Sequence, residues 1–146
     1  MKATMKNSPE IVDILLTFGA NPRLENANGE TALSMACIQE NPKICEKLLI
    51  ARASVSQTDK MGRTPLIRAA KFNKGTQIID ILMKYNANIY NTDPKKNGVL
   101  HYAAKHAQTQ VLQCLMKYGA SPYVFNSEGQ LPIDLVDQNE SVMKVL

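Results

Sequence analysis

The sequence lacks the long apolar runs that mark membrane-spanning and secreted proteins. Among its 146 residues, no apolar run approaches the roughly 18 residues needed to cross a bilayer. The first six residues, MKATMK, contain no apolar stretch of the kind that a secretory signal requires. We therefore expect no insertion into a membrane.

Cysteine is scarce, and its spacing excludes the usual paired motifs. Cys37, Cys45 and Cys114 form no Cys-x-x-Cys pair, and an odd, unpaired set is typical of reduced thiols in an intracellular compartment. Two interpretations compete: small buried apolar side chains, or a redox or metal site. The first is favoured because the cysteines have no histidine partners with which to form a metal site. We therefore expect an intracellular chain, cytoplasmic or nuclear.

The chain also lacks the short motifs of common enzymes. It has no Gly-x-x-x-x-Gly-Lys-Ser/Thr loop, no Gly-x-Gly-x-x-Gly and no His-Glu-x-x-His. Its two histidines, His101 and His106, stand five residues apart, which is not the i, i+4 spacing of a helical metal pair. The sequence therefore predicts no catalytic residues, no metal site and no cofactor.

What the sequence does contain is a repeated unit, best formed at residues 59–70, DKMGRTPLIRAA. Gly62 permits the backbone of a tight turn, Thr64 can cap a helix through its hydroxyl, and Pro65 suits the first helical position. Leu66 then points into a core, and the two alanines that close the segment allow a neighbouring helix to approach. This stretch predicts a turn followed by a closely packed helix.

The same pattern recurs at a fixed period along nearly the whole chain. Its core aliphatic residue falls at Leu33, Leu66, Leu100 and Ile133, which are spacings of 33, 34 and 33. A second half-pattern keeps the same register and occurs at residues 14–20, 47–53, 81–87 and 114–120. Two half-patterns in one register indicate an array of structural repeats.

This pattern resembles the signature of the ankyrin repeat. The resemblance implies an all-α fold, an ankyrin-repeat solenoid of stacked helix-turn-helix units with β-turn fingers, in which each unit contacts only its neighbours. We therefore expect a single domain over residues 1–146. Because both end repeats look incomplete, the sequence predicts a fragment of a longer protein. The predicted division is a partial repeat at 1–25, full repeats at 26–58, 59–92 and 93–125, and a partial terminal repeat at 126–146.

Three places carry specific structural expectations. Arg52 stands where the other repeats have glycine or asparagine at a helix end, so its backbone is predicted to be left-handed. The turn at 93–98 has lysine in the glycine position and glycine in the threonine position, which predicts a finger of different shape. Near the N-terminus, Ile11, Ile14 and Leu15 are expected to form the buried stripe of a helix.

The resemblance also implies where a partner binds, since ankyrin-repeat proteins use a concave surface made by the fingertips and the exposed face of each first helix. By the same resemblance, His101 is a structural histidine whose ring ties a turn to a helix. In the last repeat the surface positions are Ser127, Glu128, Gln130, Gln138 and Asn139. In the full repeats the predicted partner-binding residues are Ile38, Gln39, Lys60, Met61, Arg63, Lys71, Phe72, Lys95, Asn97, Lys105 and His106.

Positive charge is concentrated in the middle of the chain. Residues 59–124 carry ten Lys or Arg against three Asp, a net of +7, whereas residues 1–58 balance six against six and residues 125–146 carry one against four. A solvated basic surface that keeps the chain soluble is one explanation. A binding face for an acidic partner is the other.

The leading hypothesis is a non-catalytic protein-protein interaction module within a larger intracellular regulator or scaffold. Met61, Phe72 and Ile38 would supply apolar anchors rimmed by lysines, so the predicted partner is a protein or peptide with acidic and apolar features. The alternative is a regulatory site for a nucleotide or phosphorylated small ligand, with Phe72 beside Lys71 and Lys74. Nucleic acid is disfavoured because the net charge is only +4 and no aromatic stacking platform is evident. The oligomeric state stays open.

Overall fold

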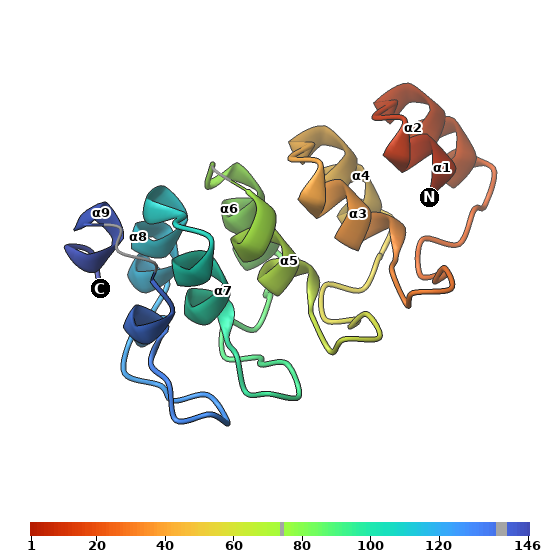
Figure 1. Cartoon of the computed structure of the whole chain (residues 1–146). Helices are drawn as coiled ribbons and strands as arrows, with labels where there is room; N and C mark the ends of the chain where they lie inside the picture. Colours follow the sequence, from red (N-terminus) through yellow and green to blue (C-terminus); the bar gives the residue numbers. More distant parts are fainter. Residues whose placement is uncertain (74, 137–139) are drawn as a thin grey trace.

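The computed structural model describes residues 1–73, 75–136 and 140–146, which form helix pairs joined by loops (Figure 1). Within these residues no strand occurs beyond one isolated bridge between Glu25 and Thr31. The predicted all-α repeat fold is therefore confirmed. The elements are α1 (Lys2–Met5), α2 (Pro9–Thr17), α3 (Ala32–Ile38), α4 (Pro42–Ile50), α5 (Pro65–Phe72), α6 (Gln77–Lys84), α7 (Val99–Lys105), α8 (Thr109–Lys117), the 3-10 helix η1 (Pro132–Leu135) and α9 (Glu140–Met143).

The helices stack in two rows, as Figure 1 shows. The first helices of the pairs form one row, in which α5 packs against both α3 and α7, and α7 packs against η1. The second helices form the other row, in which α4 contacts both α2 and α6. The loops that join one pair to the next all project to the same side, and the two chain ends lie at opposite ends of the array (Figure 1). The projecting loops and the adjacent row of first helices form the surface that contains a cleft.

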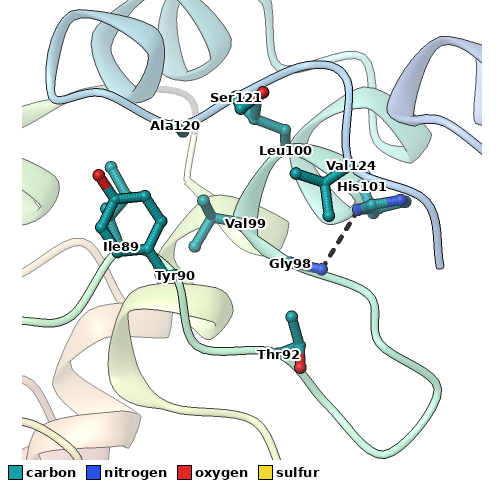
Figure 2. Close-up of a pocket in the computed structure, with 10 residues that line it drawn as sticks. All are labelled: Ile89, Tyr90, Thr92, Gly98, Val99, Leu100, His101, Ala120, Ser121 and Val124. Atoms are coloured by element: carbon teal, nitrogen blue, oxygen red, sulfur yellow. Dashed lines mark hydrogen bonds between the residues drawn. The ribbon is translucent and has the colours of Figure 1, made fainter.

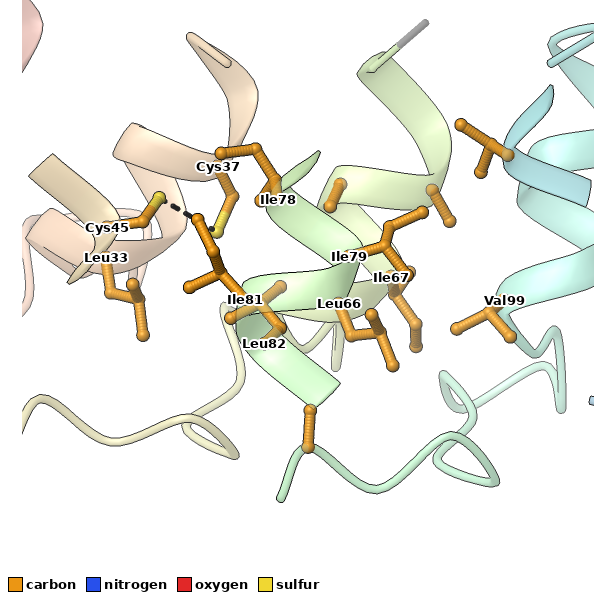
Figure 3. Packing of buried hydrophobic residues seen from close by; sticks show 14 of the residues in the cluster. Leu33, Cys37, Cys45, Leu66, Ile67, Ile78, Ile79, Ile81, Leu82 and Val99 are labelled. Atoms are coloured by element: carbon orange, nitrogen blue, oxygen red, sulfur yellow. Dashed lines mark hydrogen bonds between the residues drawn. The ribbon is translucent and has the colours of Figure 1, made fainter. Parts of the chain in front are cut away.

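Helix α5 shows why the repeated segment folds as it does. The side-chain oxygen of Thr64 accepts a hydrogen bond from the Ile67 N–H at 3.2 Å, and Pro65 occupies the first turn, as predicted. Leu66 is only 1% exposed, and the two alanines that follow in the helix are fully buried. Figure 3 shows Leu66 and Ile67 beside Leu82 of α6 in the core. Burying a leucine to this extent contributes about 2 kcal/mol.

The cysteines divide into two kinds of environment. Cys37 and Cys45 are fully buried free thiols whose sulfur atoms lie 4.0 Å apart in the same helix pair (Figure 3). The hydrogen bond to Cys45, together with burial, raises the pKa of the Cys37 thiol. Cys114 is only partly buried and donates to the Asp80 carboxylate at 3.6 Å. The prediction of small buried side chains is therefore confirmed for the first two thiols, whereas Cys114 is only partly buried against the core and also reaches Asp80 on α6.

Four β-turn fingers project from the loops, and an Asp or Asn begins each one. We number them finger 1 (26–30), finger 2 (59–63), finger 3 (93–97) and finger 4 (126–130). In finger 2, the Asp59 Oδ1 accepts the backbone N–H groups of Met61 at 2.9 Å and Arg63 at 3.0 Å. The opening residues of the other fingers also accept backbone N–H groups of their own turns. This side-chain cap fixes each turn from its first residue.

Finger 3 has the same backbone as the others, so the prediction of a different shape is wrong. Lys96 takes a φ of 60°, close to the 73° of Gly62 in finger 2. Its N–H donates to the Asp93 carbonyl at 2.9 Å, as the Gly62 N–H donates to the Asp59 carbonyl at 2.9 Å. A single lysine adopts the left-handed region at a cost of about 1 kcal/mol. The side-chain cap from Asp93 and the hydrogen bonds of the turn outweigh this cost.

His101 links the start of α7 to finger 4, although no described side chain caps this helix as Thr64 caps α5. The Gly98 N–H donates to His101 Nδ1 at 3.2 Å, and His101 Nε2 lies 3.1 Å from the Gln130 carbonyl oxygen. Since Nδ1 accepts, the ring proton is on Nε2 and donates to finger 4. Burial lowers the pKa of His101, which favours this neutral ring. The predicted structural role, a ring that ties a turn to a helix, is confirmed.

The remaining two expectations have opposite outcomes. Arg52 has a φ of 64°, so its predicted left-handed backbone is confirmed. The predicted stripe of Ile11, Ile14 and Leu15 is wrong, because all three side chains are about half exposed and Val12 is buried in their place. Helix α2 contacts α1 and α4, and Val12 is the buried residue of this helix.

Candidate functional site

Fingers 2 to 4 and helices α5 and α7 enclose a cleft of about 350 Å³. It lies across three successive repeats, on the side of the helix rows from which the fingers project. Charged, polar and apolar side chains all reach it. The residues that line it are Met61, Arg63, Lys71, Asp93, Lys95, Asn97, His101, Tyr102, Lys105, Asn126, Glu128, Gln130 and Leu135.

The cleft brings together some of the predicted partner-binding residues and leaves others apart. Phe72 and His106 follow two of its lysines and are exposed, and Lys60 is exposed at a fingertip. Ile38 is half-buried, and Gln39 donates to the Met5 carbonyl at 2.9 Å, so these two lie toward the N-terminal end. Gln138 and Asn139 lie outside the described residues. The predicted residues that line the cleft are Met61, Arg63, Lys71, Lys95, Asn97 and Lys105, with Glu128 and Gln130 from the last repeat.

A buried ion network beneath finger 2 uses much of the nearby charge. Arg68 is 3% exposed, and its two terminal nitrogens contact Glu30 at 2.6 Å and Asp59 at 2.9 Å. Arg63 contacts the same Asp59 oxygen at 2.8 Å. Hydrogen bonds from Asn26 and then Arg68 lower the pKa of Glu30. The positive charge of Arg63 is therefore already balanced within the protein.

Sequence reasoning missed Arg68 because its neighbours in α5 suggest an ordinary core helix. One signal was available: Arg68 lies one turn before Lys71, so both side chains belong on the same face of the helix. The equivalent position in α7 is Tyr102, one turn before Lys105. The hydroxyl of Tyr102 donates to the Asp93 carboxylate at 2.7 Å. This helix face carries the polar groups that lie beneath the fingers.

Two lysines of the cleft remain without a carboxylate partner. Lys71 and Lys105 form no ion pair with any described residue. Lys95, in contrast, lies 3.3 Å from the Glu128 carboxylate in an exposed pair. The Lys71 ammonium lies over the Phe72 ring, 4.9 Å from its centroid. Burial and then the charges of Arg63, Arg68 and Lys105 lower the pKa of Lys71, so this end of the cleft is electropositive.

A second hollow of about 160 Å³ lies between the second and third full repeats and is lined by residues within 89–92, 98–101 and 120–124 (Figure 2). Figure 2 shows Tyr90, Val99 and Val124 around it, with the Gly98–His101 hydrogen bond along one side. Its lining includes no lysine, arginine or carboxylate. The sequence did not predict this hollow, because its walls come from loops of two different repeats.

Neither a metal site nor a membrane span is found where the structure is described. In residues 1–73, 75–136 and 140–146, no three His, Cys, Asp or Glu side chains are grouped so that they could hold a metal ion. None of the helices in those residues is both long enough and apolar enough to cross a bilayer.

Comparison with known proteins gives relatives that are much longer than this chain. The chain is 34% identical over 139 residues to Tyrosine-protein kinase Shark of Drosophila melanogaster, covering 94% of the chain and 15% of that protein. It is 30% identical over 132 residues to the Putative palmitoyltransferase ZDHHC13 of Danio rerio, covering 90% and 20%. It is 41% identical over 70 residues to Diacylglycerol kinase iota of Rattus norvegicus, covering 46% and 7%. The chain thus spans at most a fifth of the length of these relatives.

Family models identify the repeats themselves. The model for ankyrin repeats in three copies matches residues 1–93, and the model for a single ankyrin repeat matches residues 96–127. Ankyrin repeats are general protein-interaction modules. Since the first model alone matches more than half of the residues, the chain belongs to the ankyrin-repeat family.

Proposed function

We propose that this chain binds a partner protein in the cleft beneath fingers 2 to 4, and that the bound segment is acidic with at least one apolar anchor. The observation that carries the proposal is the pair of lysines, Lys71 and Lys105, which lack ion-pair partners in the described part of the chain. Acidic groups of a partner would supply those partners. Electrostatic complementarity of this kind speeds association and selects among partners.

Apolar side chains beside the lysines support the second half of the proposal. Met61 lines the cleft and is 62% exposed, and Phe72 is 41% exposed. An exposed apolar group surrounded by charge is the usual composition of an interface centre. Arg63 and Lys95 belong to the rim, where Asp59 and Glu128 already balance their charges.

A nucleotide ligand has less support. Base stacking requires a free aromatic face, and the Lys71 ammonium covers one face of Phe72. Lys74, the second lysine of that hypothesis, lies outside the described residues. Nucleic acid also remains disfavoured on charge, as the sequence indicates.

We also propose that the chain is the interaction region of a larger intracellular regulatory or scaffold protein. Its small share of the relatives' lengths supports this, and the free thiols Cys37, Cys45 and Cys114 fit a reducing compartment. The names of those relatives denote kinases and palmitoyltransferases.

Affinity capture with matched charge variants tests the proposed cleft. The double variant Lys71→Glu/Lys105→Glu should lose the partner that the wild-type chain retains, because both unpaired cations are reversed. The control Lys84→Glu/Lys117→Glu changes the net charge equally, but on the second helices α6 and α8. Equal loss in both variants would show that the partner responds to overall charge and would contradict the cleft.

A second variant separates the apolar anchor from the charges. Phe72→Ala should raise the dissociation rate of the captured partner and weaken binding by roughly 2 kcal/mol. The lysine reversals should instead slow association, with an effect that fades as salt is added. Surface plasmon resonance at two salt concentrations distinguishes the two contributions. An unchanged dissociation rate for Phe72→Ala would remove Phe72 from the proposed site.

A further inference from the structure

We propose that Lys71, Lys105 and His106 form a binding site for a phosphomonoester carried by the partner protein. This inference rests on the proposed function and names the chemistry of one contact within it. It would make recognition depend on phosphorylation of the bound segment.

The other cations at the cleft have ion-pair partners, and Lys71 and Lys105 have none among the described residues. Arg63 and Arg68 are balanced by Glu30 and Asp59, all four within one connected network. The exposed pair of Lys95 and Glu128 is balanced in the same way. Two ammonium groups, those of Lys71 and Lys105, are then left over at one end of the cleft.

Lys71 and Lys105 line the same cleft, and His106 directly follows Lys105 in the chain. Burial, then the charges of Lys71 and Lys105, lowers the pKa of His106. The charge of Lys105 also contributes to the lowered pKa of Lys71. These mutual effects agree with their positions, since Lys71 and Lys105 are equivalent residues of successive repeats and both line the cleft. Cations gathered in this way repel one another until an anion binds between them.

A phosphomonoester matches this arrangement better than a single carboxylate does. It carries a charge of about −1.5 to −2 near neutral pH and three strong acceptor oxygens. Two ammonium groups and one imidazole N–H would therefore each find an oxygen. A carboxylate offers one charge and two oxygens, which leaves one lysine uncompensated.

Two carboxylates line the cleft and act against an anion, those of Asp93 and Glu128. Glu128 is already paired with Lys95. Asp93 accepts hydrogen bonds from the Tyr102 hydroxyl at 2.7 Å and from the Asn97 backbone N–H at 2.8 Å. Its carboxylate is thus satisfied by groups of its own repeat.

The test uses the whole chain and small probes of matched shape. Amide chemical shifts are followed by NMR during titration with phenyl phosphate, and separately with benzoate, which replaces the phosphate by a carboxylate on the same ring. We expect saturable shifts centred on Lys71, Phe72, Lys105 and His106, with phenyl phosphate binding at least about fivefold more tightly than benzoate. Equal affinity for the two probes would overturn the phosphate assignment.

Matched variants show whether the cluster is the site. Lys71→Ala and Lys105→Ala should each weaken phenyl phosphate binding by about tenfold, and Lys105→Arg should keep most of it because the charge remains. The controls Lys84→Ala and Lys117→Ala should bind as the wild type does. If the controls weaken binding as much as the cluster variants, or if phenyl phosphate gives no saturable shift, the inference is overturned.

Two further outcomes separate this inference from its alternatives. Adenosine monophosphate that binds about tenfold more tightly than phenyl phosphate would point to a nucleotide stacked on an aromatic ring and would overturn the protein-borne phosphate. A second outcome is that the chain binds phenyl phosphate no more tightly than benzoate while Lys71→Glu/Lys105→Glu still abolishes capture of the partner. That combination would overturn this inference and leave the proposed function standing. Failure of both tests would reject the cleft itself.

Discussion

Fingers 2 and 3 each hold a carboxylate at the same point of the turn, but with different partners. In finger 2, Asp59 contacts the guanidinium groups of Arg63 and Arg68, and Arg68 continues to Glu30 in finger 1. Two repeats are thus joined through charged groups. Removing charges from water is costly, so such a network stabilises the fold only while each member keeps its partner.

In finger 3 the carboxylate is satisfied by neutral groups. Asp93 accepts hydrogen bonds from the Tyr102 hydroxyl and from the backbone and side chain of Asn97. All three donors come from the same repeat. Losing one of them removes a single hydrogen bond from Asp93, which is a smaller loss than leaving a buried charge unpaired. The comparison shows that one turn geometry can be built around a carboxylate that bonds to another repeat through Arg68, or around one whose side-chain partners all belong to its own repeat.

The junction between these two fingers also differs from its neighbours. The Lys60 N–H donates to the Asn28 carbonyl at 3.0 Å, and the Ser127 N–H donates to the Lys95 carbonyl at 2.8 Å. Between fingers 2 and 3 the equivalent residue is Pro94, which has no N–H to donate. The proposed binding cleft spans this junction, where side-chain packing takes the place of a backbone hydrogen bond.

The charged network gives the largest expected effect. Arg68→Ala should lower the free energy of unfolding by about 3–5 kcal/mol, because it leaves two carboxylates without their shared buried cation. Urea denaturation midpoints measure the change. Arg63→Ala is the matched control and should cost less, since Asp59 would keep Arg68. A midpoint for Arg68→Ala no lower than that of Arg63→Ala would contradict the central position of Arg68.

The neutral arrangement should be less sensitive to losing a partner. Tyr102→Phe removes one hydrogen bond to Asp93 and should lower stability by about 1–2 kcal/mol. The same urea midpoints provide the comparison with Arg68→Ala. A larger loss for Tyr102→Phe than for Arg68→Ala would reverse the contrast between the two fingers.

Acid should weaken both fingers over the same pH range. Burial alone would raise the pKa of Asp59 and of Asp93, but hydrogen bonds, chiefly from Arg63 and from Tyr102 and Asn97 respectively, lower both pKa values overall. A carboxyl group with a lowered folded pKa contributes its full stability above the unfolded pKa, about 3.9 for aspartate. That contribution is lost as the pH falls through the folded pKa.

Thermal unfolding at a series of pH values tests this expectation. The Tm should fall mainly below about pH 4. The variant Asp93→Asn should have a lower Tm at neutral pH and a shallower decline in acid, because one of the titrating groups is gone. An acid decline as steep as that of the wild type would show that Asp93 does not contribute to it.

The smallest expected effect concerns the turn backbone. Lys96→Gly should stabilise the chain by about 1 kcal/mol, because glycine adopts the left-handed region without strain. The reverse change in finger 2, Gly62→Ala, should destabilise it, since the φ is 73° and an added Cβ would lie 2.5 Å from the Pro94 Cδ. Urea midpoints again measure both. A lower midpoint for Lys96→Gly would mean that the lysine side chain contributes more than its backbone strain.

Features that depend on a few neighbouring residues could be predicted from the sequence. Thr64 caps the helix that begins at the next residue, Leu66 is buried by the repeat that contains it and its neighbours, and Arg52 takes the left-handed backbone that ends its helix. The repeat period itself follows from such local units. The fold could therefore be predicted in advance, as could some of the residues that line the cleft.

Other features were decided only when the repeats were stacked. Arg68 pairs with Glu30, which is 38 residues away, and this pairing balances charge that the sequence alone would assign to the binding surface. Ile14 has the periodicity of a core residue, yet its side chain is exposed in the stacked array. The stacking of the repeats also determines which lysines remain without an ion-pair partner. Charge pairing and burial depend on the distance between side chains of different repeats, and that distance is fixed by the packing of whole helices.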